Sequence, residues 1–325
     1  MRKRLLFVIL SLWLCSCDWN GERNQVDEFS PKIIAIDEYD TLVHLESQLI
    51  DYFEIDEQEN VFLTKNQGQY VYKYLSNGKM DAFAGGFGFG PGEFEDGKII
   101  RISLHDNNLI GFNVNSSKIK VYDLSLNLIE EIPYQGVLLD AEAFSDELII
   151  TSTVSTGISM NSSIKLFDSS QNLFKGEIGL IGHKNSFYRN LFTITTLNEE
   201  SFIVSYLAIN SVQIYDSSGN LITDFKLLGL PDEAAGKEYF GRTIPESLII
   251  RDTAYDSMEG NLLFIEGGGD NLTGSNTIHS YSVEGEYNYT IKLPVSVEQI
   301  RLKNGSLYSL VRDSLSSSIT KFEIR

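Results

Sequence analysis

The sequence predicts an all-β protein, a six-bladed β-propeller of four-stranded antiparallel blades over residues 31–325. Short runs of β-branched and aromatic residues alternate with Asn, Asp, Gly and Ser turns, which is the pattern of strands and hairpins. One hairpin pattern also recurs along the chain, as it does in repeat folds. A spare strand near the N-terminus indicates how the ring closes.

The recurring unit is an alternating strand that ends in an aromatic residue and Asp, then a polar turn and a second strand that opens with Leu. The clear copies are IKVYDLSLNLIEEI from Ile119, IKLFDSSQNLFKGEI from Ile164 and VQIYDSSGNLITDF from Val212. Looser copies begin at Val71 and Ile278, and ITKFEIR from Ile319 is the first half of a unit. The copies begin 48, 45, 48, 66 and 41 residues apart. A four-stranded blade needs about 40–50 residues, so the spacing fits a propeller.

Two more candidate strands precede each hairpin, for example KIIRISLHD from Lys98 and NLIGFNVN from Asn108. The last unit lacks its outer strand, whereas the run KIIAIDEYDTLVHL from Lys32 is a strand without a unit of its own. Pairing this run with ITKFEIR would close the ring and remove exposed sheet edges. The count is then six blades. A ring of five or seven blades is the alternative if the 66-residue interval, which we interpret as a loop insertion, contains further structure.

The N-terminus has the layout of a secretory signal peptide. Basic residues 2–4 precede an apolar run from Leu5 to Leu14 that is too short to cross a bilayer as a helix. The following LCSC resembles the lipobox of bacterial lipoproteins, which implies lipidation of Cys17, removal of residues 1–16 and a polar tether over residues 17–30. The expected location is the cell envelope, lipid-anchored at the outer membrane. An ordinary cleaved signal with incidental cysteines is the alternative.

The chain is strongly acidic. Its formal net charge of −19 becomes −22 when the three basic residues of the leader are removed. This argues against a nucleic-acid partner and against any membrane contact beyond the lipid, because both need concentrated Lys and Arg. Both cysteines lie in the leader, so a hydrophobic core rather than a disulfide must stabilise the mature domain.

Two stretches carry a family resemblance. GFGPGEF from Gly88 to Phe94 matches a G-x-G-P-G-E-F/Y turn, and YDSSGNL from Tyr215 matches a blade hairpin. In these motifs the chain resembles the six-bladed propeller lipoproteins of the NHL-like and TolB-like group. The resemblance implies the propeller fold over nearly the whole mature chain. Because the motifs are structural, it implies little about function.

Long connections predict where a ligand binds. In a propeller, the connections between blades and those between second and third strands leave on one face, which would hold Ala84–Gly97, Leu180–Asn190, Leu228–Glu246 and Gly267–Ser275. We expect a glycan, peptide or envelope partner protein at this face, near the channel mouth. Candidate ligand contacts are Tyr188, Arg189, Tyr239, Phe240 and Arg242. For GGFGFGPGEF a structural role is favoured, and PDEAAGKEY is expected to form a short helix with Asp232 as its N-cap.

Arginine recurs at similar positions in three expected innermost strands, at Arg101, Arg251 and Arg301. If these side chains point into the channel, they form a cationic site, since arginine binds carboxylate and sulfate well. The ligand would then be anionic, for example an acidic glycan fragment. The alternative is that these arginines form ion pairs with Asp140, Asp252 or other acids of the innermost strands.

No catalytic or metal-binding motif stands out. The four histidines, His44, His105, His183 and His279, lie in different units without metal-ligand spacing, and there is no G-x-S-x-G elbow. The aspartates of the hairpin turns are better explained as turn formers that hydrogen-bond their own backbone. No cofactor is therefore predicted, and the leading hypothesis is a lipid-anchored binding or sensing protein. The alternatives are a metal-dependent lactonase- or lyase-like propeller enzyme and an accessory subunit of an envelope complex.

Overall fold

The computed structural model describes residues 31–66, 68–94, 99–113, 118–134, 138–144, 148–154, 162–168, 171, 173–179, 191–239, 242–267 and 274–324. Every regular element in these ranges is a β-strand. No helix long and apolar enough to span a membrane occurs among them. The expected signal peptide, Cys17 and the tether lie outside the described residues.

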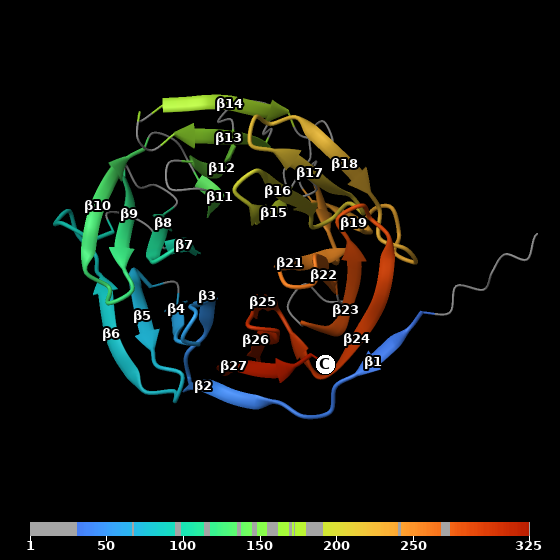
Figure 1. Cartoon of the computed structure of the whole chain (residues 1–325), viewed down its shortest axis with the longest axis horizontal. Helices are drawn as coiled ribbons and strands as arrows, with labels where there is room; N and C mark the ends of the chain where they lie inside the picture. The colour runs from blue at the N-terminus through green and yellow to red at the C-terminus, as the bar shows by residue number, and fades with distance from the viewer. Residues whose placement is uncertain are drawn as a thin grey trace, which may run out of the picture. The chain divides into compact units, whose positions relative to one another are not determined.

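Five sheets have four antiparallel strands each. Four of them are formed by consecutive strands: β3–β6 (Ile50–Ile55, Val61–Lys65, Tyr70–Tyr74, Met80–Gly85), β7–β10 (Ile99–His105, Asn108–Asn113, Lys118–Asp123, Leu128–Pro133), β11–β14 (Leu138–Ala143, Leu148–Val154, Ser162–Asp168, Leu173–Gly179) and β15–β18 (Phe192–Asn198, Ser201–Tyr206, Val212–Asp216, Leu221–Phe225). The fifth contains β2 (Asp40–Glu46), β27 (Ser316–Glu323), β26 (Ser306–Arg312) and β25 (Gln299–Lys303). Figure 1 shows these sheets as the blades of a β-propeller, with β3, β7, β11, β15 and β25 nearest the axis.

One further large sheet has five strands. It consists of β21 (Ile250–Asp256), β22 (Asn261–Glu266), β23 (Ser275–Ser282), β24 (Tyr287–Val297) and β1 (Ile33–Ala35), and β1 pairs in parallel with β24. The prediction of a propeller with four-stranded antiparallel blades is therefore confirmed, but the described residues form five such blades and not six. The predicted single strand from Lys32 is also wrong. Its apolar start adds to the edge of β24, and residues 36–39 separate it from β2.

The predicted contact between the two ends of the chain is found between β2 and β27, which pair in antiparallel orientation. Val43 lies opposite Ile319, and both side chains are buried. Next to them, His44 Nδ1 and Ser318 Oγ are 2.8 Å apart and share a hydrogen bond. Strand β2 thus becomes the outer strand of a sheet whose other strands are β25, β26 and β27.

We expect a disulfide to form when His44 and Ser318 are both replaced by cysteine. The two residues are direct partners, and paired Cα atoms of antiparallel strands are about 4.5–5.5 Å apart, within disulfide range. With Cys15 and Cys17 changed to serine, the cross-linked chain should migrate faster on a non-reducing gel, and reduction should reverse the shift. Each single-cysteine variant is the control. Failure to cross-link under oxidising conditions would contradict the pairing.

The core lies between neighbouring sheets, in six clusters of buried apolar side chains. One cluster packs Phe53 and Leu63 of the first sheet against Tyr308, Leu310 and Ile319 of the sheet that ends the chain. The alternating apolar residues of each strand supply one set of side chains to the cluster on either side. The sheets consequently depend on one another for burial of their faces.

The recurring aromatic-Asp turn is held by the aspartate side chain. Asp216 accepts hydrogen bonds from the backbone N–H groups of Ser218 and Asn220, and from Asn220 Nδ2, at 2.8–2.9 Å. Asp123 and Asp56 make the same set of bonds in their own turns. Hydrogen bonds from the asparagine partner lower the pKa of the Asp216 and Asp123 carboxyls. The prediction that these aspartates bond to their own backbone is confirmed.

The GGFGFGPGEF segment forms a tight turn between β6 and β7, as predicted. Phe94 is fully buried, its N–H donates to Gly86 O at 2.7 Å, and Glu93 Oε2 accepts from the Gly90 N–H at 2.8 Å. A Cβ at Gly88, whose φ of +156° is one that glycine adopts readily, would lie 2.0 Å from Glu93 Oε2, so a side chain there would force the Glu93 carboxylate to move. The structural role is therefore confirmed for Phe94 and the glycines, whereas Phe87 and Phe89 of the same segment are exposed.

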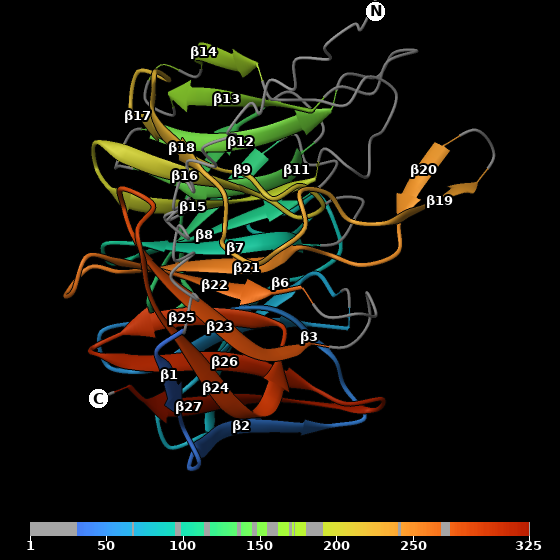
Figure 2. The same ribbon diagram turned by 90° about the vertical axis from the view of Figure 1, so that its right-hand side faces the viewer.

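The predicted helix over PDEAAGKEY is wrong. Residues Gly236–Tyr239 form strand β19, which pairs with β20 (Arg242–Pro245) in a separate two-stranded hairpin. Figure 2 shows this hairpin projecting beyond the blades. The preceding residues hydrogen-bond to residues 208–210 through the backbone, and glycine at position 236 disfavours a helix. Asp232 contacts Lys226 with its carboxylate at 2.7 Å instead of capping a helix.

Candidate functional site

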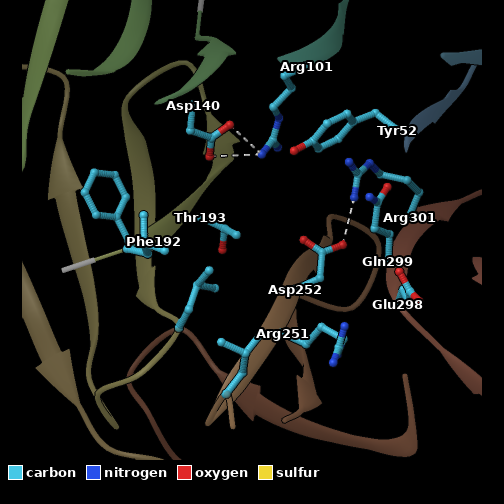
Figure 3. Close-up of a pocket in the computed structure, with 13 residues that line it drawn as sticks. Tyr52, Arg101, Asp140, Phe192, Thr193, Arg251, Asp252, Glu298, Gln299 and Arg301 are labelled. Carbon is cyan, nitrogen blue, oxygen red and sulfur yellow. Dashed lines mark hydrogen bonds and ion pairs between the residues drawn. The ribbon is translucent and has the colours of Figure 1, made fainter. Parts of the chain in front are cut away.

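A cavity of about 270 Å³ lies among the innermost strands. Its lining residues are Tyr52, Arg101, Asp140, Leu191, Phe192, Thr193, Leu207, Leu248, Arg251, Asp252, Glu298, Gln299 and Arg301. Figure 3 shows most of them converging on one space. Those that belong to strands lie near the N-terminal ends of β3, β7, β11, β15, β21 and β25. Because each of these strands follows a connection from the preceding sheet, the cavity lies on the face where we expected a ligand.

Arg101 is the centre of one buried ion network. Its Nη1 donates to both carboxylate oxygens of Asp140 at 3.0 and 3.1 Å, and its Nη2 donates to Ile194 O at 3.1 Å. Nη2 also lies 2.6 Å from Glu142 Oε2. Asp140 in turn accepts the Ile194 N–H at 3.2 Å. The network therefore joins β7, β11 and β15, the innermost strands of three successive sheets.

Arg301 is the centre of a second network of the same kind. Its Nε donates to Glu54 Oε1 at 2.7 Å, and its Nη1 donates to Asp252 Oδ2 at 3.1 Å. Asp252 Oδ2 also accepts the Ile300 N–H at 2.9 Å. The guanidinium carbon lies 5.5 Å from the ring centre of Phe53. This network joins β21, β25 and β3.

The arginine pattern had two interpretations, a cationic ligand site and ion pairs with acids of the innermost strands. The contacts of Arg101 and Arg301 decide between them. The alternative, ion pairs with Asp140 and Asp252, is confirmed. The physical reason is burial: an arginine held away from water needs a carboxylate and hydrogen-bond acceptors close by. Asp140 and Asp252 were predicted as partners from the sequence, whereas Glu54 and Glu142 were not. These two could have been recognised, because each stands two residues after another cavity residue of its strand and so faces the same side.

Burial dominates the titration of this region. It raises the pKa of Asp140, against the influence of Arg101, and it raises the pKa of Glu142 to about 7, where Glu54 adds repulsion. Burial also raises the pKa of Tyr52 to about 12, with Asp140 acting in the same direction. For Arg301, burial lowers the pKa but Glu54 and Asp252 outweigh it. The Tyr52 hydroxyl thus stays protonated, and the raised pKa places the titration of Glu142 near neutrality.

Arg251 has different surroundings. Its side chain is half-buried and lines the cavity. Burial lowers its pKa, Glu298 opposes that effect, and Arg312 adds repulsion. Arg312 itself is 2.7 Å from Glu298 in an ion pair. Arg251, Arg312 and Glu298 therefore influence one another electrostatically at this side of the cavity.

Among the described residues, two neutral polar side chains of the cavity lining have a buried atom without a hydrogen-bond partner. Gln299 donates from Nε2 to Asp51 O at 2.6 Å, and its buried Oε1 has no donor in the part of the chain that the structure describes. Thr193 Oγ1 is likewise buried and has no hydrogen-bond partner among those residues. Buried polar atoms usually have partners, so these two are available to a bound molecule.

Two of the other predicted ligand contacts, Tyr239 and Arg242, lie on the β19–β20 hairpin. Their backbones pair at the end of that hairpin. Tyr188, Arg189 and Phe240 lie outside the described residues, so their role stays a prediction. Within the described ranges, no group of three or more His, Cys, Asp or Glu side chains is arranged to hold a metal ion.

No protein-family model matches the sequence. No curated protein matches it either. Solved structures do match the fold. The structure of U3-55K has a TM-score of 0.57 and 11% identity, and the match covers 91% of this chain and 100% of that chain. The WD40 β-propeller domain of Doa1 has a TM-score of 0.55 and 11% identity, with 90% and 93% covered. The Pan2 WD40 domain of Neurospora crassa has a TM-score of 0.56 and 8% identity, with 91% and 98% covered. At such identities the similarity shows the fold alone: the chain is a β-propeller.

Proposed function

We propose that this protein is a lipid-anchored binding or sensing propeller of the bacterial cell envelope, located at the outer membrane. The leader and its lipobox-like LCSC support the anchor at Cys17. The GFGPGEF turn and the YDSSGNL hairpin support a place in the NHL-like and TolB-like group. In this proposal all six large sheets form one ring, which the β2–β27 pair closes. The six core clusters between neighbouring sheets support this ring.

The observation that carries the binding role is the axial cavity. It lies at the start of the innermost strands and combines Arg251 with buried hydrogen-bonding groups and an apolar wall. Such a combination in a concave site is typical of small-ligand binding. The proposed ligand is an anionic group of a glycan, a peptide or an envelope protein, held at the channel mouth. The metal-dependent lactonase- or lyase-like alternative would be favoured by retention of calcium or zinc in the purified protein.

Arg251→Gln is the variant that tests this role. We expect the wild-type protein to bind at least one anionic probe among an oligogalacturonate, a sulfated oligosaccharide and a peptide with a free carboxyl terminus. Loss of the Arg251 guanidinium should weaken that binding about tenfold or more. Titration calorimetry is the measurement, and Arg301 is left intact because its removal would break a buried network.

Lys226→Gln is the matched control, because this exposed cation lies on the connection after β18 and does not line the cavity. Its binding constants should equal those of the wild-type protein. If no probe binds the wild-type protein, or if Arg251→Gln binds as tightly as the wild type, the proposed role of the cavity is wrong.

A further inference from the structure

We propose that an exposed aromatic patch on the first sheet (β3–β6) binds a proline-rich segment of a partner protein. The patch consists of Tyr70, Tyr72 and Phe83, which lie on the two outer strands β5 and β6. Figure 1 shows these strands at the rim of the propeller. None of the three residues lines the axial cavity, so the patch is a site separate from the one proposed above.

The repeating fold does not require aromatic residues at this place. Tyr72 lies opposite Phe83 in the β5–β6 register, two residues before Tyr74, the buried aromatic residue of the repeat. The corresponding pairs of the other large sheets are Lys120–Glu131, Lys165–Glu177, Gln213–Asp224, His279–Thr290 and Thr320–Thr41. All five pairs are polar. The aromatic pair is therefore particular to the first sheet, and the packing of the repeat does not explain it.

The patch faces water although its rings are large and apolar. The exposed fraction is 38% for Tyr70 and 59% for Phe83. The ring centres of Tyr70, Tyr72 and Phe83 lie 5.9–6.2 Å from one another, so the three side chains form one contiguous surface. Single exposed apolar residues are common in soluble proteins, whereas a contiguous group of them indicates an interaction site.

The orientation of the rings favours a proline-rich segment over a broad flat ligand. The ring planes meet at 34–68°, so a flat ligand would contact only one ring face. A polyproline II helix rises about 3.1 Å per residue, so prolines two residues apart are offset by about 6 Å, close to the ring spacing of the patch. Such a segment can place proline rings against more than one aromatic ring, as in other proteins that recognise this conformation.

The polar atoms of the patch suit a ligand that supplies acceptors. Proline has no backbone N–H, so a proline-rich segment presents carbonyl oxygens that need donors. The hydroxyls of Tyr70 and Tyr72 make no hydrogen bond within the described ranges, and both can donate to such carbonyls.

A lysine adds charge complementarity. Lys65 Nζ lies 4.0 Å from the ring centre of Tyr72. Among the described residues, Lys65 has no carboxylate partner, although the protein is strongly acidic. An acidic residue next to the prolines would therefore complement this cation.

A preformed segment also suits a patch on an open surface. The polyproline II conformation exists before contact, so binding costs little conformational entropy. Tyrosine contributes a large and rigid contact area, because few of its bonds have to be fixed. Affinity can therefore be reached without a deep cleft.

Fluorescence anisotropy of a labelled peptide with three Pro-Pro-Glu repeats, titrated with the full-length protein, tests this assignment. We expect saturable binding that is at least tenfold weaker in Phe83→Ala. The double variant Tyr72→Lys, Phe83→Glu copies the pair formed by Lys120 and Glu131, and it should lose at least as much affinity. Ile222→Ala is the matched control and should bind as the wild type does, because Ile222 is also 59% exposed on an outer strand, β18.

Thermal unfolding verifies that each variant is folded. Phe83→Ala keeps the test decisive if the double variant does not fold, because the Phe83 side chain is largely exposed. A peptide of Ala-Ala-Glu repeats with the same length and charge should bind at least tenfold more weakly than the Pro-Pro-Glu peptide. Equal binding of the two peptides would show that charge alone is recognised, and the assignment would then be wrong.

The assignment also fails if the Pro-Pro-Glu peptide does not bind the wild type, or if Phe83→Ala binds it as tightly as the wild type does. Binding of a cello-oligosaccharide that Phe83→Ala removes, without peptide binding, would assign the patch to a glycan instead. Self-association that the same variant removes would assign it to a second copy of the chain. None of these results depends on ligand binding at the axial cavity, so the proposed function is tested separately.

Discussion

Replacing Asp140 by alanine should lower the free energy of unfolding by about 3–5 kcal/mol. The carboxylate accepts two hydrogen bonds from Arg101 and one each from the Ile194 and Ala141 N–H groups, and both charged side chains are buried. Alanine would leave the Arg101 guanidinium with Glu142 as its remaining carboxylate and the Ile194 N–H without an acceptor. Because the network joins three innermost strands, the loss should affect the whole propeller. Urea denaturation followed by circular dichroism measures it.

The matched control is Asp81→Ala. Asp81 also forms an ion pair, 3.5 Å from Lys73, but its side chain is 44% exposed. Ion pairs in water contribute about 0–1 kcal/mol, so this variant should be nearly as stable as the wild type. Asp140→Asn keeps the shape and one acceptor and should fall between the two. If Asp140→Ala lowers the free energy of unfolding by less than about 1 kcal/mol, the Arg101 network is not a main contribution to the stability of the fold.

The free energy of unfolding of the wild type should fall by about 3 kcal/mol as the pH rises and Glu142 loses its proton. Glu142→Gln should abolish this fall. Burial raises the folded-state pKa of Glu142 from 4.5 to about 7, with Arg101 and Arg301 opposing the shift and Glu54 and Asp140 adding to it. Below pH 4.5 the carboxyl is protonated in both states. As the pH rises, the unfolded chain releases this proton first, so stability is lost progressively until the pH passes about 7. The size follows from about 1.4 kcal/mol per pKa unit.

The measurement is the unfolding free energy of the wild type and of Glu142→Gln at pH 5 and pH 8. The wild type should lose more stability between these values than the variant, because glutamine mimics the neutral acid. At pH 8 the variant should therefore be the more stable of the two. Equal losses in both proteins would show that Glu142 does not titrate in this window. Comparing the difference between the proteins removes the contribution of all other titrating groups.

The strands and their turns could be predicted from sequence because their causes are local. Alternation of apolar and polar residues sets each strand, and the Asp216 carboxylate closes its turn on Ser218 and Asn220, within four residues. The structural role of the GFGPGEF turn follows in the same way from short-range contacts, as in the bond from the Gly90 N–H to Glu93. The helix over PDEAAGKEY failed because backbone groups of residues 232–234 bond to residues 208–210, which no local pattern reveals.

Only part of the candidate site could be predicted from the sequence. The arginines at positions 101, 251 and 301 were recognised by their similar places in the innermost strands, and all three line the cavity. Thr193 and Gln299 were missed, because neutral polar residues in a strand give no signal until their hydrogen bonds are known. These two polar groups of the cavity were therefore not identifiable from sequence.

The sequence by itself determined the class of fold, the repeating four-strand unit and the contact between the chain ends, since all three depend on periodicity and on counting strands. Only the tertiary structure decided which sheet each part of the N-terminal run joins and which charges meet in the channel. Glu54 and Arg301, which form one ion pair, are 247 residues apart. A buried charge needs an oppositely charged partner, because burying it without one costs free energy. That cost arises only once the sheets surround a common axis.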